Sequence, residues 1–148
     1  AIKQMAQDTD WGSLDILIVD MPPGTGDAQI TVSQNLPLNG AIVISTPQSV
    51  ALNDAKKAIG MFEKVDVKIL GIVENMSYFI LPDGSKEDIF GKDGGKNLAK
   101  ELKVNFIGSI PLDKEIRLNS DLGDPSKLEE KYFDEIVNSF LKNSKLKI

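Results

Sequence analysis

Apolar residues gather in four short runs along the chain, each bounded by polar residues, Gly or Pro. These runs are Leu14–Asp20, Gly40–Ser45, Val67–Val73 and Val104–Ile110. The first three consist mostly of aliphatic and β-branched residues, a pattern typical of strands that are covered on both faces. We therefore expect four strands of a parallel sheet.

Helical spacing of apolar residues marks the stretches between these runs. In residues 50–64, for example, Ala55, Ile59 and Phe62 fall on one face of a predicted helix. The predicted helices are Asp27–Leu36, Val50–Lys64, Gly94–Leu102 and a C-terminal helix that carries Leu128, Tyr132, Ile136 and Phe140. Strands that alternate with helices are typical of the α/β class, with a parallel sheet flanked by helices.

Three segments fall outside this pattern. Tyr78–Lys92 combines Pro, Gly and charged residues without regular spacing, and we expect a loop that leaves the core. Ala1–Thr9 resembles the end of a helix that is already under way, and 142–148 resembles a mobile, lysine-rich tail. Because no repeat or linker interrupts the pattern, we expect residues 1–148 to form one domain, the C-terminal portion of a longer one.

Composition narrows the chemistry that this domain can perform. The chain has 148 residues and contains neither Cys nor His, which excludes thiolate and imidazole ligands and leaves oxygen-bound cations such as Mg²⁺. Its net charge of −5 argues against a nucleic-acid-binding surface. The apolar runs are too short to span a membrane, and no signal peptide is present, so we expect a cytoplasmic location.

The segment Asp20–Asp27 (DMPPGTGD) directly follows the first predicted strand. A carboxylate at the carboxyl end of a parallel strand lies where α/β sheets bind ligands, and nucleotide hydrolases hold Mg²⁺ with such an acid. Gly24 has no side chain and can offer its N–H to a terminal phosphate. Asp20 and Gly24 are therefore candidate catalytic residues, with Asp20 holding Mg²⁺ through water, whereas Asp27 is better explained as a helix N-cap.

Polar residues follow the other predicted strands as well. They are Thr46–Ser49, Glu74–Asn75 and the sequence Pro111, Leu112 and Asp113. Asn75 carries the paired donor and acceptor that suit an adenine edge, although a lone Asn is more often a turn former. Thr46 or Ser49 is equally well explained as a cap of the helix that follows. Because carboxyl ends of parallel strands share one edge of a sheet, these groups together predict a nucleotide site.

The segment Gly91–Lys96 (GKDGGK) has the composition of a phosphate-binding loop but not its spacing. The Walker A pattern requires Gly where Phe90 stands and Ser or Thr where Asn97 stands. We therefore expect this segment to begin a helix.

These segments together resemble the C-terminal part of the Mrp/ApbC family, MinD-like P-loop ATPases that carry iron–sulfur clusters to apoproteins. The segments that carry the resemblance are Trp11–Gly12, Leu14–Gln34 (LDILIVDMPPGTGDAQITVSQ), Thr46–Phe62 (TPQSVALNDAKKAIGMF), Leu70–Phe79 (LGIVENMSYF), Ile89–Gly91, Gly94–Gly95 and Ile107–Arg117 (IGSIPLDKEIR). The resemblance extends over residues 1–125, and DMPPGTGD together with ENMSYF is highly specific.

The resemblance implies roles for the candidate residues. Asp20 is similar to the Walker B acid and Asp20–Gly24 to switch II, while Asn75 is similar to the Asn that reads adenine and Pro111–Asp113 to the loop that closes over the base. It also implies ATP and Mg²⁺ as cofactors and an ATP-dependent, dimeric switch that carries iron–sulfur clusters. Helix 50–64 and the excursion over 75–91 would face the partner subunit, and iron–sulfur apoproteins would be the clients.

Two features depart from the family's pattern. The phosphate-binding loop, whose strand lies between those matching Leu14–Asp20 and Gly40–Ser45, is absent from the sequence. We therefore expect the chain alone to bind ATP weakly without hydrolysing it, and its two unpaired strand edges to close together or to self-associate. The family's CxxC pair corresponds to Leu81 and Gly84, which cannot ligate a cluster. Either the protein has another task, or the cluster ligands come from elsewhere.

Two alternative functions stay open at this point. A MinD/ParA-like switch would use ATP to dimerise and recruit partners without a cluster, and the absence of Cys favours it. A receiver-like signalling domain would use Asp20 as its phosphoacceptor, because an acid with a nearby Pro after a strand also fits that class. Such a domain needs a Lys near the position where Glu74–Asn75 stand.

Overall fold

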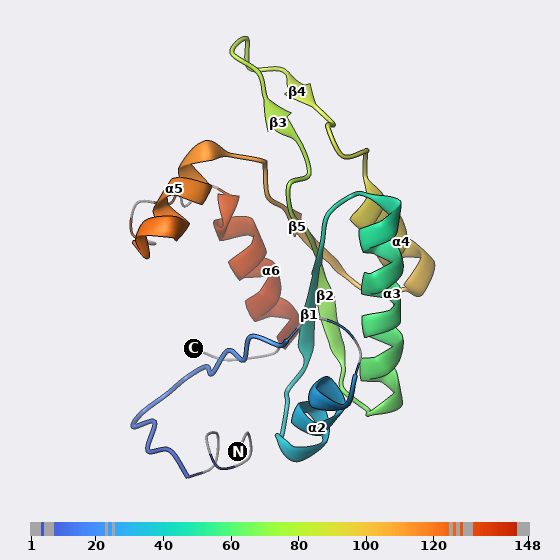
Figure 1. Ribbon diagram of the computed structural model, residues 1–148, viewed down its shortest axis with the longest axis vertical. Coiled ribbons are helices and arrows are strands. Elements are labelled where there is room, and N and C mark those ends of the chain that lie inside the picture. The colour runs from blue at the N-terminus through green and yellow to red at the C-terminus, as the bar shows by residue number, and fades with distance from the viewer. Residues whose placement is uncertain are drawn as a thin grey trace.

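The computed structural model describes residues 4, 8–22, 24, 26–124, 126, 128 and 132–144. Within these residues, a parallel sheet is formed by β1 (Ala41–Ser45), β2 (Ile69–Glu74) and β5 (Phe106–Ser109), in the order β1-β2-β5 (Figure 1). All six residues of the central strand β2 are buried, as expected for a strand with neighbours on both sides and helices on both faces. Three of the four predicted strands and the predicted fold class are confirmed.

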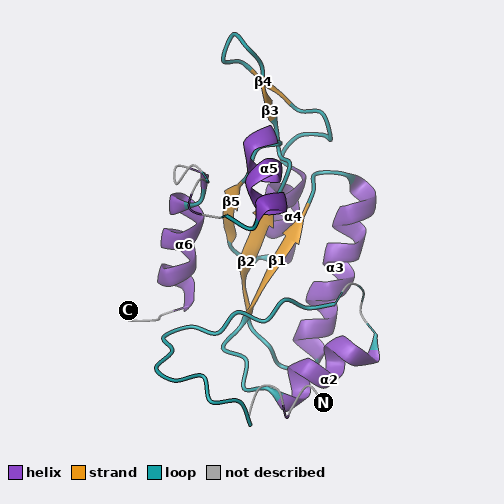
Figure 2. Cartoon of the chain, turned by 60° about the vertical axis from the view of Figure 1, so that its left-hand side comes forward, coloured by secondary structure: helices purple, strands orange, loops and turns teal. Residues whose placement is uncertain are grey.

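Helices cover the two faces of the sheet unequally. The helices α3 (Ser49–Lys64) and α4 (Gly94–Leu102) pack on one face, against β1 and β2, whereas α6 (Asp134–Ser144) packs on the other, against β2 and β5 (Figures 1 and 2). The helix α2 (Asp27–Asn35) contacts α3. Because α6 does not cover β1, the side chains of Ile42 and Ile44 are exposed on that face, Ile44 by 63%.

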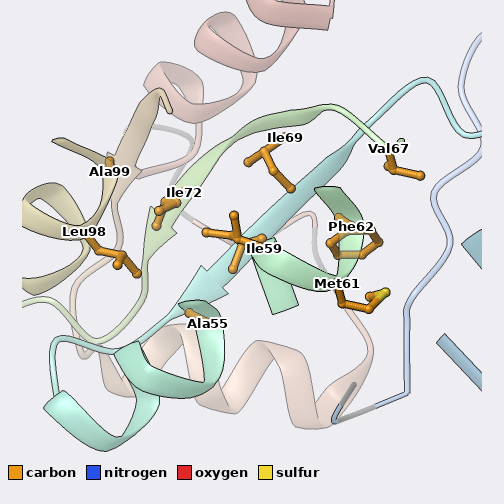
Figure 3. Close-up of a cluster of buried hydrophobic side chains, with 10 residues drawn as sticks. Ala55, Ile59, Met61, Phe62, Val67, Ile69, Ile72, Leu98 and Ala99 are labelled. Carbon is orange, nitrogen blue, oxygen red and sulfur yellow. The ribbon is translucent and has the colours of Figure 1, made fainter. Parts of the chain in front are cut away.

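The main core lies between α3, α4 and the sheet. Ile59 from α3 and Ile72 from β2 are almost fully buried at its centre (Figure 3). Around them lie Val43, Ala55, Met61, Phe62, Val67, Ile69, Leu98 and Ala99. The apolar face predicted for residues 50–64 is therefore the face that packs on the sheet, which explains why this helix could be located closely from the sequence.

The segment predicted as a loop over Tyr78–Lys92 contains a short antiparallel hairpin. Its strands are β3 (Phe79–Ile80) and β4 (Lys86–Glu87), and the hairpin projects from the body of the molecule beyond the carboxyl ends of the sheet (Figures 1 and 2). The Lys86 ammonium lies 3.8 Å from the centre of the Tyr78 ring, a cation–π contact that supports the base of the hairpin.

A further helix, α5 (Lys114–Leu122), follows the last strand and was not predicted. Its ends carry recognisable signals: Asp113 is the N-cap, and Gly123 ends the helix in a left-handed conformation with φ of 65°. The helix has few apolar residues, so apolar spacing gave little indication of it.

The prediction of a strand over Leu14–Asp20 is wrong for this structure. The segment is extended but pairs with no described strand, and Ile18 is 84% exposed. An apolar run becomes a strand only where a neighbouring strand satisfies its backbone groups. Among the described residues β1 pairs with β2 alone, so the outer edge of β1 is unpaired. The expected closure of the gap between these two segments is therefore not observed.

The structure describes only part of the two terminal segments for which predictions were made. The helix α6 continues to Ser144, so residues 142–144 of the predicted tail are helical, while residues 145–148 lie outside the described residues. The proposed helix end over Ala1–Thr9 also lies mostly outside them. No helix in the described part of the chain is long and apolar enough to cross a membrane.

Candidate nucleotide-binding edge

The loops after β1, β2 and β5 meet at the carboxyl edge of the sheet. The backbone N–H of Asn75 donates to the carbonyl of Ser45, 2.8 Å away, at the end of β1. On the other side, the N–H of Ile110 donates to the carbonyl of Glu74 at 2.8 Å. The turn after β2 is therefore fixed between its two neighbours by main-chain hydrogen bonds, as the parallel topology requires.

The loop Pro111–Asp113 lies beside this turn. The N–H of Ser77 donates to the carbonyl of Ile110 at 2.9 Å, and the N–H of Leu112 donates to the carbonyl of Tyr78 at 2.8 Å. Pro111 is buried, while Leu112 is half-buried. The structure thus brings together Asn75 and the loop Pro111–Asp113, which the sequence analysis assigned to one site.

The side chain of Asn75 is half-buried and locally anchored. Its Oδ1 accepts a hydrogen bond from the N–H of Met76 at 2.9 Å, and Met76 takes a left-handed conformation with φ of 52°. This local turn explains why an Asn suits the position, because Asn side chains readily bond to nearby backbone groups. The same anchoring holds the amide at the rim, where it can present hydrogen-bonding groups to a ligand.

Both carboxylate oxygens of Asp113 already have protein partners. Oδ1 accepts from the N–H of Glu115 at 2.7 Å and thereby caps α5, and Oδ2 accepts from the hydroxyl of Tyr132 at 3.3 Å. The acidic side chain therefore orders the loop and the start of α5.

The structure does not bring Asp20 and Gly24 to this edge. Both residues are exposed, and the segment that precedes α2 lies towards the amino ends of the strands (Figures 1 and 2). The side-chain amide of Gln29 donates to the carbonyl of Pro22 at 2.9 Å and ties this segment to α2. The prediction that Asp27 is the N-cap of α2 is wrong, because Gly26 occupies that position.

The segment Thr46–Ser49 does not cap α3 through its hydroxyl groups. Gln48 is the N-cap residue, no side-chain cap bond is made, and Ser49 is already helical. The hydroxyl of Thr46 instead donates to Oε1 of Gln48 at 3.4 Å. Of the two interpretations that the sequence left equally open, capping by Thr46 or Ser49 is thus not observed, and Thr46 is half-buried.

Leu81 and Gly84 lie in the turn at the tip of the β3–β4 hairpin. The N–H of Gly84 donates to the carbonyl of Leu81 at 2.8 Å, and the N–H of Leu81 donates to the carbonyl of Ser85 at 2.9 Å. The Asp83 carboxylate accepts from the hydroxyl of Ser85 at 2.6 Å and from its N–H at 2.9 Å, and these bonds lower the pKa of Asp83. The turn is thus closed by its own hydrogen bonds.

Among the described residues, Asn75 and Asp113 belong neither to a cluster of metal-binding side chains nor to the lining of two surface hollows. Among these residues no three acidic side chains gather closely enough to hold a cation. Two shallow surface hollows lie on the α3 side, one of about 410 Å³ against α2 and one of about 530 Å³ between α3, α4 and Phe90–Gly94. Neither hollow is lined by Asn75 or Asp113.

Comparison with known proteins identifies the family. Residues 1–144 match the model of the ParA family described as NUBPL iron-transfer P-loop NTPase. The chain belongs to this family. The resemblance to the Mrp/ApbC ATPases that DMPPGTGD and ENMSYF indicated is thereby confirmed.

Similar proteins occur in plants, animals and archaea. The chain is 48% identical to the iron–sulfur protein required for NADH dehydrogenase, mitochondrial, of Arabidopsis thaliana, over 98% of the chain. It is 49% identical to the iron–sulfur cluster transfer protein NUBPL of Mus musculus over 91% of the chain, and 52% identical to the iron–sulfur cluster carrier protein of Pyrococcus horikoshii over 88%. The chain spans 49%, 43% and 44% of these three relatives, less than half of each.

Two solved structures share the fold of this chain. A nucleotide-binding protein from Archaeoglobus fulgidus in complex with ADP is 42% identical and superposes with a TM-score of 0.80, over 90% of this chain and 55% of the other. The MinD cell division protein of Aquifex aeolicus, 19% identical, superposes with a TM-score of 0.58 over 86% of this chain and 52% of the other. The second likeness concerns the fold alone and confirms the MinD-like architecture.

Proposed function

We propose that this chain forms the base-binding part of an ATP site in a dimeric iron–sulfur cluster carrier of the NUBPL type. The observation that carries the proposal is the shared edge on which Asn75 and the loop Pro111–Asp113 lie side by side. The Asn75 amide would hydrogen-bond the edge of a purine, and Pro111 and Leu112 would line its apolar face. The ADP bound by the similar protein of Archaeoglobus fulgidus supports this choice of ligand.

The phosphates and Mg²⁺ require groups that this edge does not supply. We infer that Asp20 and Gly24 join the site as the Mg²⁺-binding and γ-phosphate-binding residues only when their segment enters the sheet on the β1 side, next to the strand of a phosphate-binding loop. The unpaired outer edge of β1 and the exposed run Leu14–Asp20, which has the composition of a strand, support this inference. In the present arrangement we expect weak nucleotide binding and no ATP hydrolysis.

A nucleotide titration of Asn75→Ala tests the base-binding role. Calorimetry with ADP and GDP should show that the unaltered chain prefers ADP. The Asn75→Ala substitution should lower the affinity for ADP by about three- to thirtyfold and the affinity for GDP by less. The matched control is Asn138→Ala, because Asn138 is an exposed Asn on α6. Equal ADP affinities for the two variants would refute the assignment of Asn75.

We propose that the cluster, as cargo, is held by groups outside this chain. Neither Leu81 nor Gly84 has a metal-binding side chain, and the sequence contains no Cys or His. Anaerobic incubation of the chain with iron and sulfide, followed by desalting, should leave no bound cluster by visible absorbance. A stoichiometric cluster that survives desalting would overturn this assignment.

Iron–sulfur apoproteins are the expected clients, and a homodimer is the expected assembly. The cytoplasmic location stays a prediction.

A second candidate is a MinD/ParA-like switch that recruits partners without carrying a cluster. The specific observation in its favour is the hairpin tip, which is a closed turn without ligands at Leu81 and Gly84. Cluster transfer to an apoprotein by a longer protein that contains this chain would distinguish the two, because only the carrier accelerates the appearance of holo-protein. The family match argues against the receiver-like alternative.

A further inference from the structure

Glu74 carries a carboxylate that the nucleotide site does not use. It ends β2 and is 1% exposed, and no ion pair of the described residues includes it. A buried carboxylate is costly unless hydrogen bonds compensate for the lost water. The hydrogen-bond partners of Glu74 therefore decide what this buried side chain does.

The two partners of Glu74 lie at opposite ends of the excursion that carries the hairpin. One carboxylate oxygen accepts from the hydroxyl of Ser77, two residues before β3 begins, and the other accepts from the N–H of Gly95 in the first turn of α4. Both hydrogen bonds are buried, and the amino end of a helix favours a negative charge. One side chain therefore connects the point where the chain leaves the sheet with the point where it returns.

Packing around this carboxylate leaves little freedom. A Cβ at Gly95 would lie 3.2 Å from both Cβ and Oε2 of Glu74, so the helix approaches as closely as a glycine allows. The preceding residue, Gly94, is packed against Pro47 after β1, since a Cβ there would lie 2.6 Å from the Pro47 carbonyl oxygen. The carboxylate and the start of α4 are thus held against the loops that form the nucleotide edge.

We propose that Glu74 is a positioning residue that fixes the β3–β4 hairpin and Asn75 in one orientation relative to the sheet. Asn75 follows Glu74 directly, and the hairpin begins at Phe79. Loss of either hydrogen bond loosens one end of the excursion, which keeps its main-chain hydrogen bonds at Ser77 and Tyr78, while the sheet and the main core keep their contacts. The link to nucleotide binding rests on the function proposed above, whereas the effect on the hairpin does not.

Amide hydrogen exchange of residues 78–92 in the full chain tests this proposal, together with ADP titration. Ser77→Ala removes one partner of Glu74, and Glu74→Asp shortens the side chain so that it cannot reach both partners. We expect exchange in 78–92 to accelerate about three- to tenfold in both variants, relative to amides of β2, with a similar loss of ADP affinity. The matched control is Ser33→Ala, because Ser33 is a buried serine whose hydroxyl donates to the Gln29 carbonyl within α2.

Glu74→Gln separates positioning from a general loss of stability. The Gln side chain keeps the length, an acceptor for Gly95 and a donor for the Ser77 oxygen, so it should restore slow exchange in 78–92. The proposal is overturned if Ser77→Ala and Glu74→Asp speed exchange uniformly over the whole chain, or if the hairpin exchanges as in Ser33→Ala. If no variant and not even the unaltered chain binds ADP, the proposed nucleotide site fails, and the exchange data still decide the role of Glu74.

Discussion

The same substitution, Gly to Ala, should have opposite effects on stability at two positions of this fold. Gly71 lies in the buried centre of β2, where a Cβ would lie 2.2 Å from Cγ1 of Ile107 and 2.9 Å from the carbonyl oxygen of Asn105. Gly60 lies within α3, and a Cβ there would meet nothing within 4 Å. The two positions therefore separate the steric cost of a methyl group from its effect on backbone entropy.

The magnitudes follow from these distances. Overpacking a core costs about 1–3 kcal/mol, and Gly→Ala recovers about 0.4–1 kcal/mol through the unfolded chain. Because Ile107 is buried and a backbone oxygen must also move, we expect Gly71→Ala to lower the free energy of unfolding by about 2 kcal/mol. Gly60→Ala should raise it by about 0.5–1 kcal/mol, since Ala is the better helix former.

Urea unfolding followed by circular dichroism measures both changes, and thermal unfolding provides a check. At roughly 2–4 °C per kcal/mol for a domain of this size, the Tm should fall by about 4–8 °C for Gly71→Ala and rise by about 1–4 °C for Gly60→Ala. Ile107→Ala removes the clashing atoms, so it should cost less in the Gly71→Ala background than alone. A Gly71→Ala variant as stable as the unaltered chain, or an additive double variant, would refute the steric argument.

Three further changes test other parts of the structure. Ile59→Ala should lower the free energy of unfolding by about 2–5 kcal/mol in urea titrations, because this side chain is 1% exposed at the centre of the core. Asp113→Ala should cost about 0.5–2 kcal/mol through the lost cap of α5, whereas Asp113→Asn should retain most of it. The pKa of Asp83 is lowered in the folded hairpin, so the ionised side chain stabilises the folded state. This contribution to stability is present above the ordinary aspartate pKa and is lost as the pH falls through the lowered value. An NMR pH titration of Asp83 should show this low pKa, and Ser85→Ala should raise it towards the ordinary value, because the Ser85 hydroxyl is the main cause.

The elements that the sequence predicted well are those whose partners are all present in the chain. The helices 50–64 and 94–102 carry an apolar face of helical spacing, and the strands they cover pair with one another. For such elements the local pattern and the tertiary contacts agree. The predicted bounds of these two helices therefore lie within two residues of the observed bounds. The same agreement placed Asn75 and Pro111–Asp113 at one edge.

Other features depend on information that apolar spacing does not contain. The helix α5 is specified by its caps, Asp113 and Gly123, more than by an apolar face. The β3–β4 hairpin has only two residues in each strand, with its register set by the turn Leu81–Ser85. Attention to turn and cap residues in these segments would have indicated both elements.

Asp20 shows why one part of the candidate site could not be placed from its own segment. Its run has the composition of a buried strand, yet burial of Leu17 and Ile18 requires a neighbouring strand, and among the described residues the outer edges of both β1 and β5 are unpaired. Asn75 differs because β2 has a neighbour on each side, and both neighbours hydrogen-bond to the turn that bears it. The position of Asn75 is therefore determined by contacts within this chain, whereas the position of Asp20 depends on strand pairing at the outer edge of β1. Binding of the base and coordination of Mg²⁺ should accordingly be separable, with the first detectable in this chain and the second dependent on an added strand.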